Sequence, residues 1–193
     1  MVKADCGGCN GCSRCCHGMG NSIILDPYDV YRMTTGMGKS MQELLAASVE
    51  LNVVDGVILP NLKMQGAEEA CAYLDGRGRC SIHPYRPGIC RLFPLGRYYE
   101  NGGFSYFLQT GECAKENRSK IKVSKWIDTP DLTRNQQFTL QWHDLLHAME
   151  ERLTGEDEGK QREENLLLLR LFYLLPYEGT IDFYTQFTER MEH

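Results

Sequence analysis

A run of eleven residues near the start of the chain, "CGGCNGCSRCC" at positions 6–16, carries five cysteines, namely Cys6, Cys9, Cys12, Cys15 and Cys16. The other residues of this run are Gly, Asn, Ser and Arg, which offer no apolar neighbours among which five thiols would be buried as ordinary core residues. Core packing therefore does not explain the run, and its sulfur atoms need another role.

Disulfide bonds are the first alternative. Cys15 and Cys16 are sequence neighbours with Cα atoms about 3.8 Å apart, below the usual disulfide range of about 4.4–6.8 Å. The opening residues "MVKADCGGCNG" contain no apolar segment typical of a secretory signal. Clustered cysteines in a reducing compartment favour metal or redox chemistry. We therefore predict a cytoplasmic protein that binds metal ions through thiolates.

The chain has 193 residues, of which 42% are hydrophobic, enough for a sizeable core without disulfide support. Its most apolar run, residues 166–175, is about half the length of a membrane span and includes Arg170. We therefore predict no membrane association. The net charge of −5 argues against nucleic acid as a partner, because phosphate binding needs a basic face.

Charge is unevenly distributed along the chain. Residues 77–125 carry 10 basic and 3 acidic side chains, whereas residues 126–193 carry 6 basic and 14 acidic ones. Cations close to thiolates stabilise them and lower thiol pKa values. The alternatives are a solvated charged surface and a docking face. A protein partner would bind either the basic 77–125 region or the acidic C-terminal helices.

The pattern predicts an α+β fold. A strand precedes Asp26, which caps a helix that starts at Pro27, and a capping box from Ser40 to Glu43 starts a second helix. Turn pairs predict short hairpins around 55–56, 75–76 and 101–102, and the proline-rich residues 83–94 read as an ordered loop.

From residue 129 onward the apolar residues recur at helical spacing, with a linker at 155–159 and breaks at Pro176 and Gly179. We therefore expect an irregular cysteine-rich metal-binding region with short hairpins at 1–125. A helical C-terminal region at 126–193 would pack on it.

Two sets of four cysteines in the first cluster are alternative ligand sets. Cys6, Cys9, Cys12 and Cys16 have the spacing of a bacterial ferredoxin run, although His17 replaces its proline. Alternatively, Cys9, Cys12, Cys15 and Cys16 act together and Cys6 is a bystander. A zinc site would take further thiolates from Cys71, Cys80, Cys90 or Cys113, whose spacings match no standard zinc knuckle. The cofactor is thus an iron–sulfur cluster or zinc.

The stretches "CNGCSRCC" (9–16), "CAYLDGRGRCSIHPYRPGICRLFP" (71–94) and "GEC" (111–113) together resemble the CxxCxxCC (YkgJ-type) family of zinc- or iron-chelating cysteine-cluster proteins. The resemblance implies metal ligands at Cys9, Cys12, Cys15, Cys16, Cys71, Cys80, Cys90 and Cys113. Ser13 and His83 stand where the family often has glycine and tyrosine. Cys6, His17 and His83 are additional candidate ligands.

Three functions remain open: a metal-binding module, a small electron carrier, and a redox or methyl-transferring enzyme. The third follows from the similarity of the cysteine motif to that of some flagellin lysine methylases. No residue pattern selects catalytic side chains. His143 and His147 share a helix face, but without the Glu of HExxH we interpret them as packing residues. Tyr173, Tyr177 and Tyr184 are candidates for lining a pocket.

Overall fold

The computed structural model describes residues 1–5, 7, 12–115 and 117–193. Its helices are α1 (Pro27–Met37), α2 (Met41–Ala47), α3 (Gly88–Leu92), α4 (Val123–Ile127), α5 (Leu132–Leu153), α6 (Glu158–Leu169) and α7 (Phe183–Met191). Two 3-10 turns, η1 (Arg14–Cys16) and η2 (His83–Tyr85), and a π-helical turn, η3 (Arg170–Leu174), complete the helical elements of the described residues.

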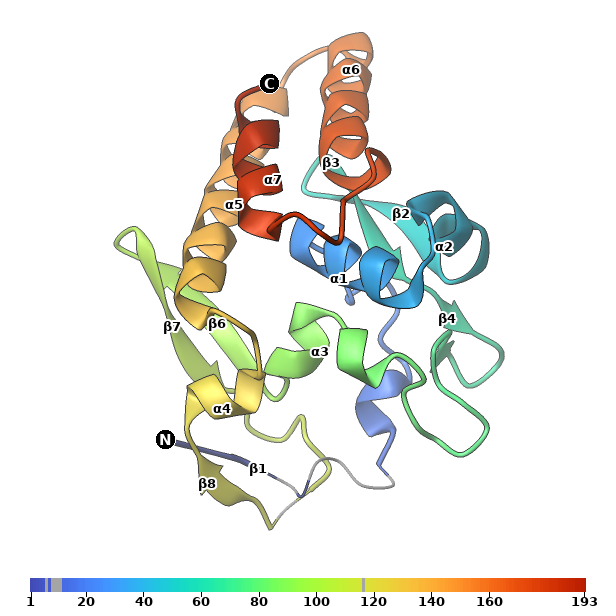
Figure 1. Ribbon diagram of the computed structural model, residues 1–193, viewed down its shortest axis with the longest axis vertical. Coiled ribbons are helices and arrows are strands. Elements are labelled where there is room, and N and C mark those ends of the chain that lie inside the picture. Colours follow the sequence, from blue (N-terminus) through green and yellow to red (C-terminus); the bar gives the residue numbers. More distant parts are fainter. Residues whose placement is uncertain (6, 8–11, 116) are drawn as a thin grey trace.

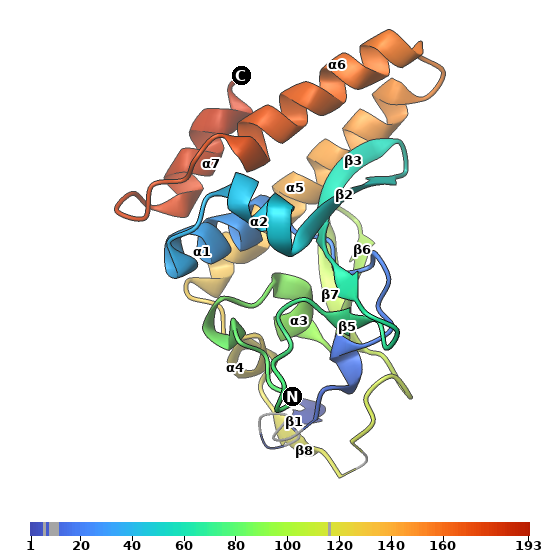
Figure 2. The same ribbon diagram turned by 90° about the vertical axis from the view of Figure 1, so that its right-hand side faces the viewer.

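Among the described residues, all strands pair antiparallel, two by two. They are β1 (Val2–Asp5) with β8 (Ser119–Ile121), β2 (Val49–Val54) with β3 (Val57–Leu62), β4 (Met64–Gln65) with β5 (Ala70–Cys71), and β6 (Leu95–Glu100) with β7 (Gly103–Leu108). Helices of the C-terminal region gather at one end of the molecule, and the β1–β8 pair lies at the other (Figures 1 and 2). The α+β class and the helical C-terminal half are thus as predicted.

Local signals account for the elements that were predicted correctly. The Asp26 side chain accepts a hydrogen bond from the Asp29 N–H, and Pro27 occupies the first turn of α1. Ser40 and Glu43 form the predicted capping box of α2. Asn101 and Gly102 both have positive φ, as a two-residue turn between twisted strands requires.

Two expectations about the first hundred residues were wrong. The strand expected before Asp26 is an isolated bridge between Ile24 and Asn61. Its neighbour Leu25 donates a hydrogen bond to the Pro60 carbonyl, and Pro60 has no N–H to continue a ladder. The loop expected at 83–94 contains η2 and α3, because Pro87 precedes a short helical turn that its own ring does not interrupt.

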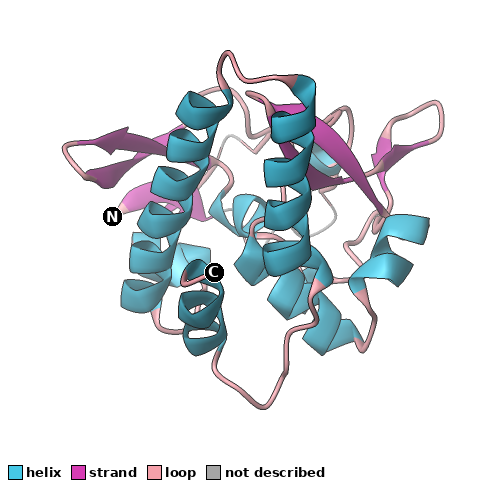
Figure 3. Ribbon diagram, turned by 90° about the horizontal axis from the view of Figure 1, so that it is seen from above, coloured by secondary structure: helices cyan, strands magenta, loops and turns pink. Residues whose placement is uncertain are grey.

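One hydrophobic core joins both regions of the chain. Tyr28 of α1 packs against Phe183 of α7 with ring centroids 5.0 Å apart, and Phe138 of α5 contacts Phe183 edge-on at 5.1 Å. Seen from above, the C-terminal helices stand side by side over the hairpins (Figure 3). None of the helices in the described ranges is long and apolar enough to cross a membrane.

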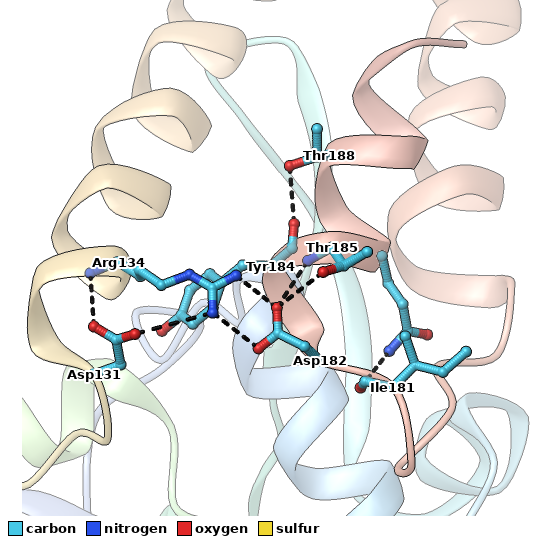
Figure 4. Close-up of polar contacts among 8 residues, drawn as sticks. Asp131, Arg134, Ile181, Asp182, Tyr184, Thr185 and Thr188 are labelled. Atoms are coloured by element: carbon cyan, nitrogen blue, oxygen red, sulfur yellow. Dashed lines mark hydrogen bonds and ion pairs between the residues drawn. The ribbon is translucent and has the colours of Figure 1, made fainter.

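An exposed ion pair fastens α7 to α5. Arg134 donates to both carboxylate oxygens of Asp182, at 3.2 and 2.6 Å, and Asp182 also accepts the Thr185 N–H as the N-cap of α7 (Figure 4). Because Arg134 and Asp182 are each nearly half exposed, water screens the pair, and we expect it to contribute little to stability.

Candidate metal centre

Backbone pairing brings the N-terminal thiols to the second cysteine cluster. His17, which follows η1, forms an antiparallel bridge with Ala70, and the Gly18 N–H donates to the Glu69 carbonyl at 3.0 Å. In an antiparallel pair, the residue before one partner faces the residue after the other. Cys16 therefore lies across from Cys71.

A tight turn returns Cys80 to the same place. Leu74 and Cys80 form an isolated antiparallel bridge, and between them Asp75 accepts the N–H groups of Arg77 and Arg79, each at 2.9 Å. An aspartate that binds backbone groups two and four residues ahead stabilises such a turn. The turn predicted around 75–76 is thus present, although its two sides are joined by a single bridge.

Cys90 comes from α3, which is fastened to α1. The Gly88 N–H donates to Oδ1 of Asp29 at 2.6 Å, and Arg91 lies 3.9 Å from the same oxygen. Cys71, Cys80 and Cys90 are all partly buried and pack against the main core. The N-terminal segment, the 71–80 turn and α3 therefore present thiols to one region.

Cys15 and Cys16 are electrostatically unequal. A hydrogen bond from the Cys16 thiol lowers the pKa of Cys15 to about 6, burial opposes this shift, and the Arg86 guanidinium adds to it. The same hydrogen bond, together with burial, raises the pKa of Cys16. At neutral pH the Cys15 thiolate thus accepts a hydrogen bond from the Cys16 thiol.

Burial is the main cause that raises the pKa of each of three further thiols, Cys71, Cys80 and Cys90. The charge of Cys15 also raises the pKa of each of them, which places all the sulfur atoms in one electrostatic neighbourhood. We refer to five residues as the inner thiols: Cys15, Cys16, Cys71, Cys80 and Cys90.

Two further cysteines lie on the side of Cys15 that faces a small cavity. Cys12, Cys15 and Cys113 line this space of about 20 Å³, together with Trp126 and Lys115. A cavity of this size holds about one water molecule. Cys12 and Cys113, the outer thiols, are therefore adjacent to the inner thiols through Cys15.

The donor set fits a thiolate-bound metal in its chemistry. Soft sulfur donors suit zinc and iron–sulfur clusters, and Arg86 places a cation beside Cys15 and Cys80. In the parts of the chain that the structure describes, no three His, Cys, Asp or Glu side chains already form a group that could hold a metal ion. Binding through both Cys15 and Cys16 requires their mutual hydrogen bond to be exchanged for metal–sulfur bonds.

The other sequence candidates have different surroundings. Cys6 and Cys9 lie outside the described residues. His17 is paired with the Glu68 carbonyl at 3.4 Å, and His83 lies 2.7 Å from the Arg86 guanidinium. Burial and the charge of Arg86 lower the pKa of His83, so both favour the neutral imidazole over the cation.

The helical candidates lie elsewhere. His143 stacks on Tyr99 of β6 with ring centroids 3.8 Å apart, a packing role. Tyr173 and Tyr177 line a cavity of about 120 Å³ beside Lys39, and their hydroxyl groups donate to main-chain carbonyls. Tyr184 instead stacks on Tyr28, with ring centroids 5.8 Å apart.

Sequence reasoning missed the polar pair behind Cys90. Asp29 is 2% exposed, and burial and the charge of Asp26 raise its pKa to about 8 against the effect of Arg91. From the sequence, Asp26 was identified as the cap of α1, and Asp29, three residues later, was given no role. Arg91 was counted only as one of the basic side chains of residues 77–125, for which a field beside the thiolates and a solvated surface were both open, and it is buried. The sequence signal that could have identified Arg91 is its position directly after the candidate ligand Cys90.

A mixed α+β fold in which dispersed segments present partly buried thiols defines a cysteine-rich metal-binding protein. The family model described as "CxxCxxCC: Putative zinc- or iron-chelating domain" matches residues 8–122, more than half of the chain, and the chain belongs to this family. The predicted family and the zinc-or-iron cofactor class are thereby confirmed. No curated protein and no solved structure matches the chain.

Proposed function

We propose that the chain is a cytosolic metal-binding module that holds an iron–sulfur cluster or zinc through cysteine thiolates. The observation that carries this proposal is the convergence of the inner thiols from three separate segments. The seven cysteines that the structure describes are free thiols. Clustered thiols without disulfide bonds are typical of a reducing compartment.

The inner thiols would supply the main ligands, and the outer thiols with Cys9 would complete the eight positions implied by the family. Arg86, beside Cys15 and Cys80, would offset part of the negative charge of the bound centre. A bound metal would cross-link η1, β5 and α3, which no disulfide connects among the described residues. Its binding energy would therefore contribute to folding.

The test is elemental analysis with an absorption spectrum on protein purified without oxygen. Iron with acid-labile sulfide and a broad visible band would identify a cluster, whereas zinc in colourless protein would identify a closed thiolate site. Cys71→Ser and Cys80→Ser should lower the metal content, and Leu166→Ala, at an exposed position of α6, is the control. Wild-type protein that retains no transition metal would contradict the proposal.

An enzyme is the second candidate, because an open cavity next to Cys15 is what a reactive centre needs. Its volume of about 20 Å³ has space for one water and no substrate. This small volume favours the binding module over a redox or methyl-transferring enzyme. Turnover of an added methyl donor or electron acceptor by metal-loaded protein would reverse that order.

A small electron carrier is the third candidate, and it would need a protein partner. The basic 77–125 region includes the highly exposed Arg77, and the C-terminal region from 126 onward is acidic. Complementary charge would steer such a partner and make its association sensitive to salt. Reversible one-electron reduction of the isolated protein is the measurement that separates a carrier from a storage or structural module.

A further inference from the structure

Helix α3, which carries Cys90, has no cap of its own. Its N-cap residue is Pro87, and no side chain within the helix start accepts a hydrogen bond from its first N–H groups. The first N–H groups of a helix have no intrahelical partner and need an acceptor when buried. Gly88, the first residue of α3, is buried.

The missing acceptor comes from another helix. Oδ1 of Asp29 in α1 accepts the Gly88 N–H at 2.6 Å across a sequence separation of 59 residues. The other oxygen of Asp29 accepts the Asp26 N–H at 3.4 Å. Asp29 therefore caps two helix starts at once, that of its own helix and that of α3.

Arg91 completes the attachment from the α3 side. Its Nη2 lies 3.9 Å from Asp29, its Nη1 donates to the Arg86 carbonyl at 3.2 Å, and its guanidinium is 5.7 Å from the centroid of the Tyr28 ring. Arg91 is 4% exposed. Gly88, two residues before Cys90, and Arg91, directly after it, are thus both tied to α1 by buried polar contacts.

The position of Asp29 argues against an electrostatic role toward the thiols. A carboxylate near Cys90 opposes ionisation of that thiol, whereas metal binding needs the thiolate. Asp29 therefore offers the centre no favourable charge, because burial and the charge of Asp26 favour its protonated form and its ionised form opposes the Cys90 thiolate. What Asp29 supplies is an acceptor for the Gly88 N–H, and this hydrogen bond fixes the position of α3 relative to α1.

We propose that Asp29 is a positioning residue, which caps α3 from α1 and thereby holds the Cys90 thiol toward the other inner thiols. This inference rests on the proposed metal-binding function. Asp29 itself would not bind the metal. It would act through Cys90, so its removal should matter only while Cys90 is a ligand.

The experiment measures the rate at which metal-loaded protein, as purified, releases its zinc or iron to a chromophoric chelator. Asp29→Ala should release metal about tenfold faster or more, because a buried N–H loses its acceptor. Asp29→Asn retains an acceptor oxygen and should stay within about threefold of wild type. The matched control is Asp182→Ala, since Asp182 also caps a helix and pairs with an arginine, Arg134, at the junction of α5 and α7 (Figure 4).

A double-mutant cycle separates positioning from general destabilisation. If Asp29 acts through Cys90, the double variant Asp29→Ala/Cys90→Ser should release metal at the rate of Cys90→Ser alone. The inference would be overturned if the two substitutions multiplied each other's effect on the release rate in the double variant. It would also be overturned if Asp182→Ala accelerated metal release as much as Asp29→Ala does. Wild-type release rates in Asp29→Ala would do the same while leaving the proposed function intact, whereas wild-type protein without metal would refute both.

Should Asp29→Ala fail to fold, the pair replacement Asp29→Leu with Arg91→Met provides the test. Apolar residues of similar size commonly replace a buried ion pair without loss of stability. The Gly88 N–H would still lack an acceptor, so metal release should remain about tenfold faster than in wild type. A wild-type release rate in this folded variant would overturn the positioning role.

Discussion

Gly36 of α1 and Tyr85 of η2 touch so closely that a β-carbon at position 36 would lie 2.3 Å from Cδ1 of the tyrosine ring. Three ring carbons, including Cγ near the main chain, would be closer than 3.0 Å. Arg32, on the same helix, donates to the Pro84 carbonyl. The segment that leads to Cys90 therefore docks on α1 at a surface that only glycine leaves open.

Gly36→Ala should destabilise the protein by about 1–3 kcal/mol, because Tyr85 must move. Alanine in an ordinary helix interior would instead stabilise by about 1 kcal/mol relative to glycine. Urea unfolding of metal-loaded protein measures the difference. In the Tyr85→Ala background the same substitution should be neutral or stabilising, and a persistent loss there would show that the ring contact is not the cause.

Removal of the metal should lower the melting temperature substantially, since the inner thiols belong to three segments that a bound centre would cross-link. The measurement is a thermal melt before and after treatment with a chelator, with metal loss verified by elemental analysis. Readdition of metal without oxygen should restore the original curve. Identical melting of the loaded and stripped protein would refute the cross-linking role.

The turn before Cys80 should loosen in acid. Hydrogen bonds from the Arg79 and Arg77 N–H groups hold the pKa of Asp75 below its ordinary value of 3.8. A carboxyl whose pKa is depressed in the folded state contributes its full stabilisation above its unfolded pKa, and this contribution is lost as the pH falls through the folded pKa. The amide resonances of Arg77 and Arg79 should therefore titrate with a midpoint below 3.8. A midpoint at or above it would contradict the turn geometry.

In metal-free protein, Cys15 should be the first inner thiol to react with iodoacetamide at pH 7, because its pKa of about 6 leaves it mostly ionised. Burial raises the pKa of Cys90, which should react late. Peptide mass mapping against time checks the order. Lowering the pH from 7 to 5 should slow labelling of Cys15 about tenfold, and metal loading should protect both residues.

Asn165→Ala should cost about 2–3 kcal/mol, because it leaves the Ile58 N–H without its acceptor. In the structure Oδ1 of Asn165 accepts that N–H at 2.6 Å, and Nδ2 donates to the Gly56 carbonyl at 3.2 Å. The neighbouring Leu166 is 54% exposed, so Leu166→Ala should change stability by less than about 0.5 kcal/mol.

Denaturant unfolding followed by circular dichroism and by metal absorbance measures these stability changes. The same curves test whether the proposed regions 1–125 and 126–193 unfold together. Since Asn165 joins α6 to the β2–β3 hairpin, both probes should report one shared transition. Two separate transitions would show that the regions unfold independently, and an Asn165→Ala effect no larger than that of Leu166→Ala would remove this link.

Much of the architecture could be predicted because its causes are local. Asp26 and Ser40 mark helix starts through contacts three residues away, and Asn101-Gly102 marks a hairpin through its own backbone preferences. Local signals failed where the decisive contact is remote. Helix α3 was read as loop because its cap, Asp29, belongs to another helix, and β1 was missed because its partner β8 lies more than a hundred residues away.

The sequence by itself determined that this chain carries a cysteine cluster of the zinc- or iron-chelating family, because cysteine spacing and its flanking residues are properties of the linear chain. Only the tertiary structure decided which thiols meet. Cys15 and Cys16 reach Cys71 through the pairing of His17 with Ala70, and Cys90 reaches them through the attachment of α3 to α1. Each of these contacts has a backbone group as at least one partner, and because every residue carries such groups, no residue pattern predicts which segments will meet.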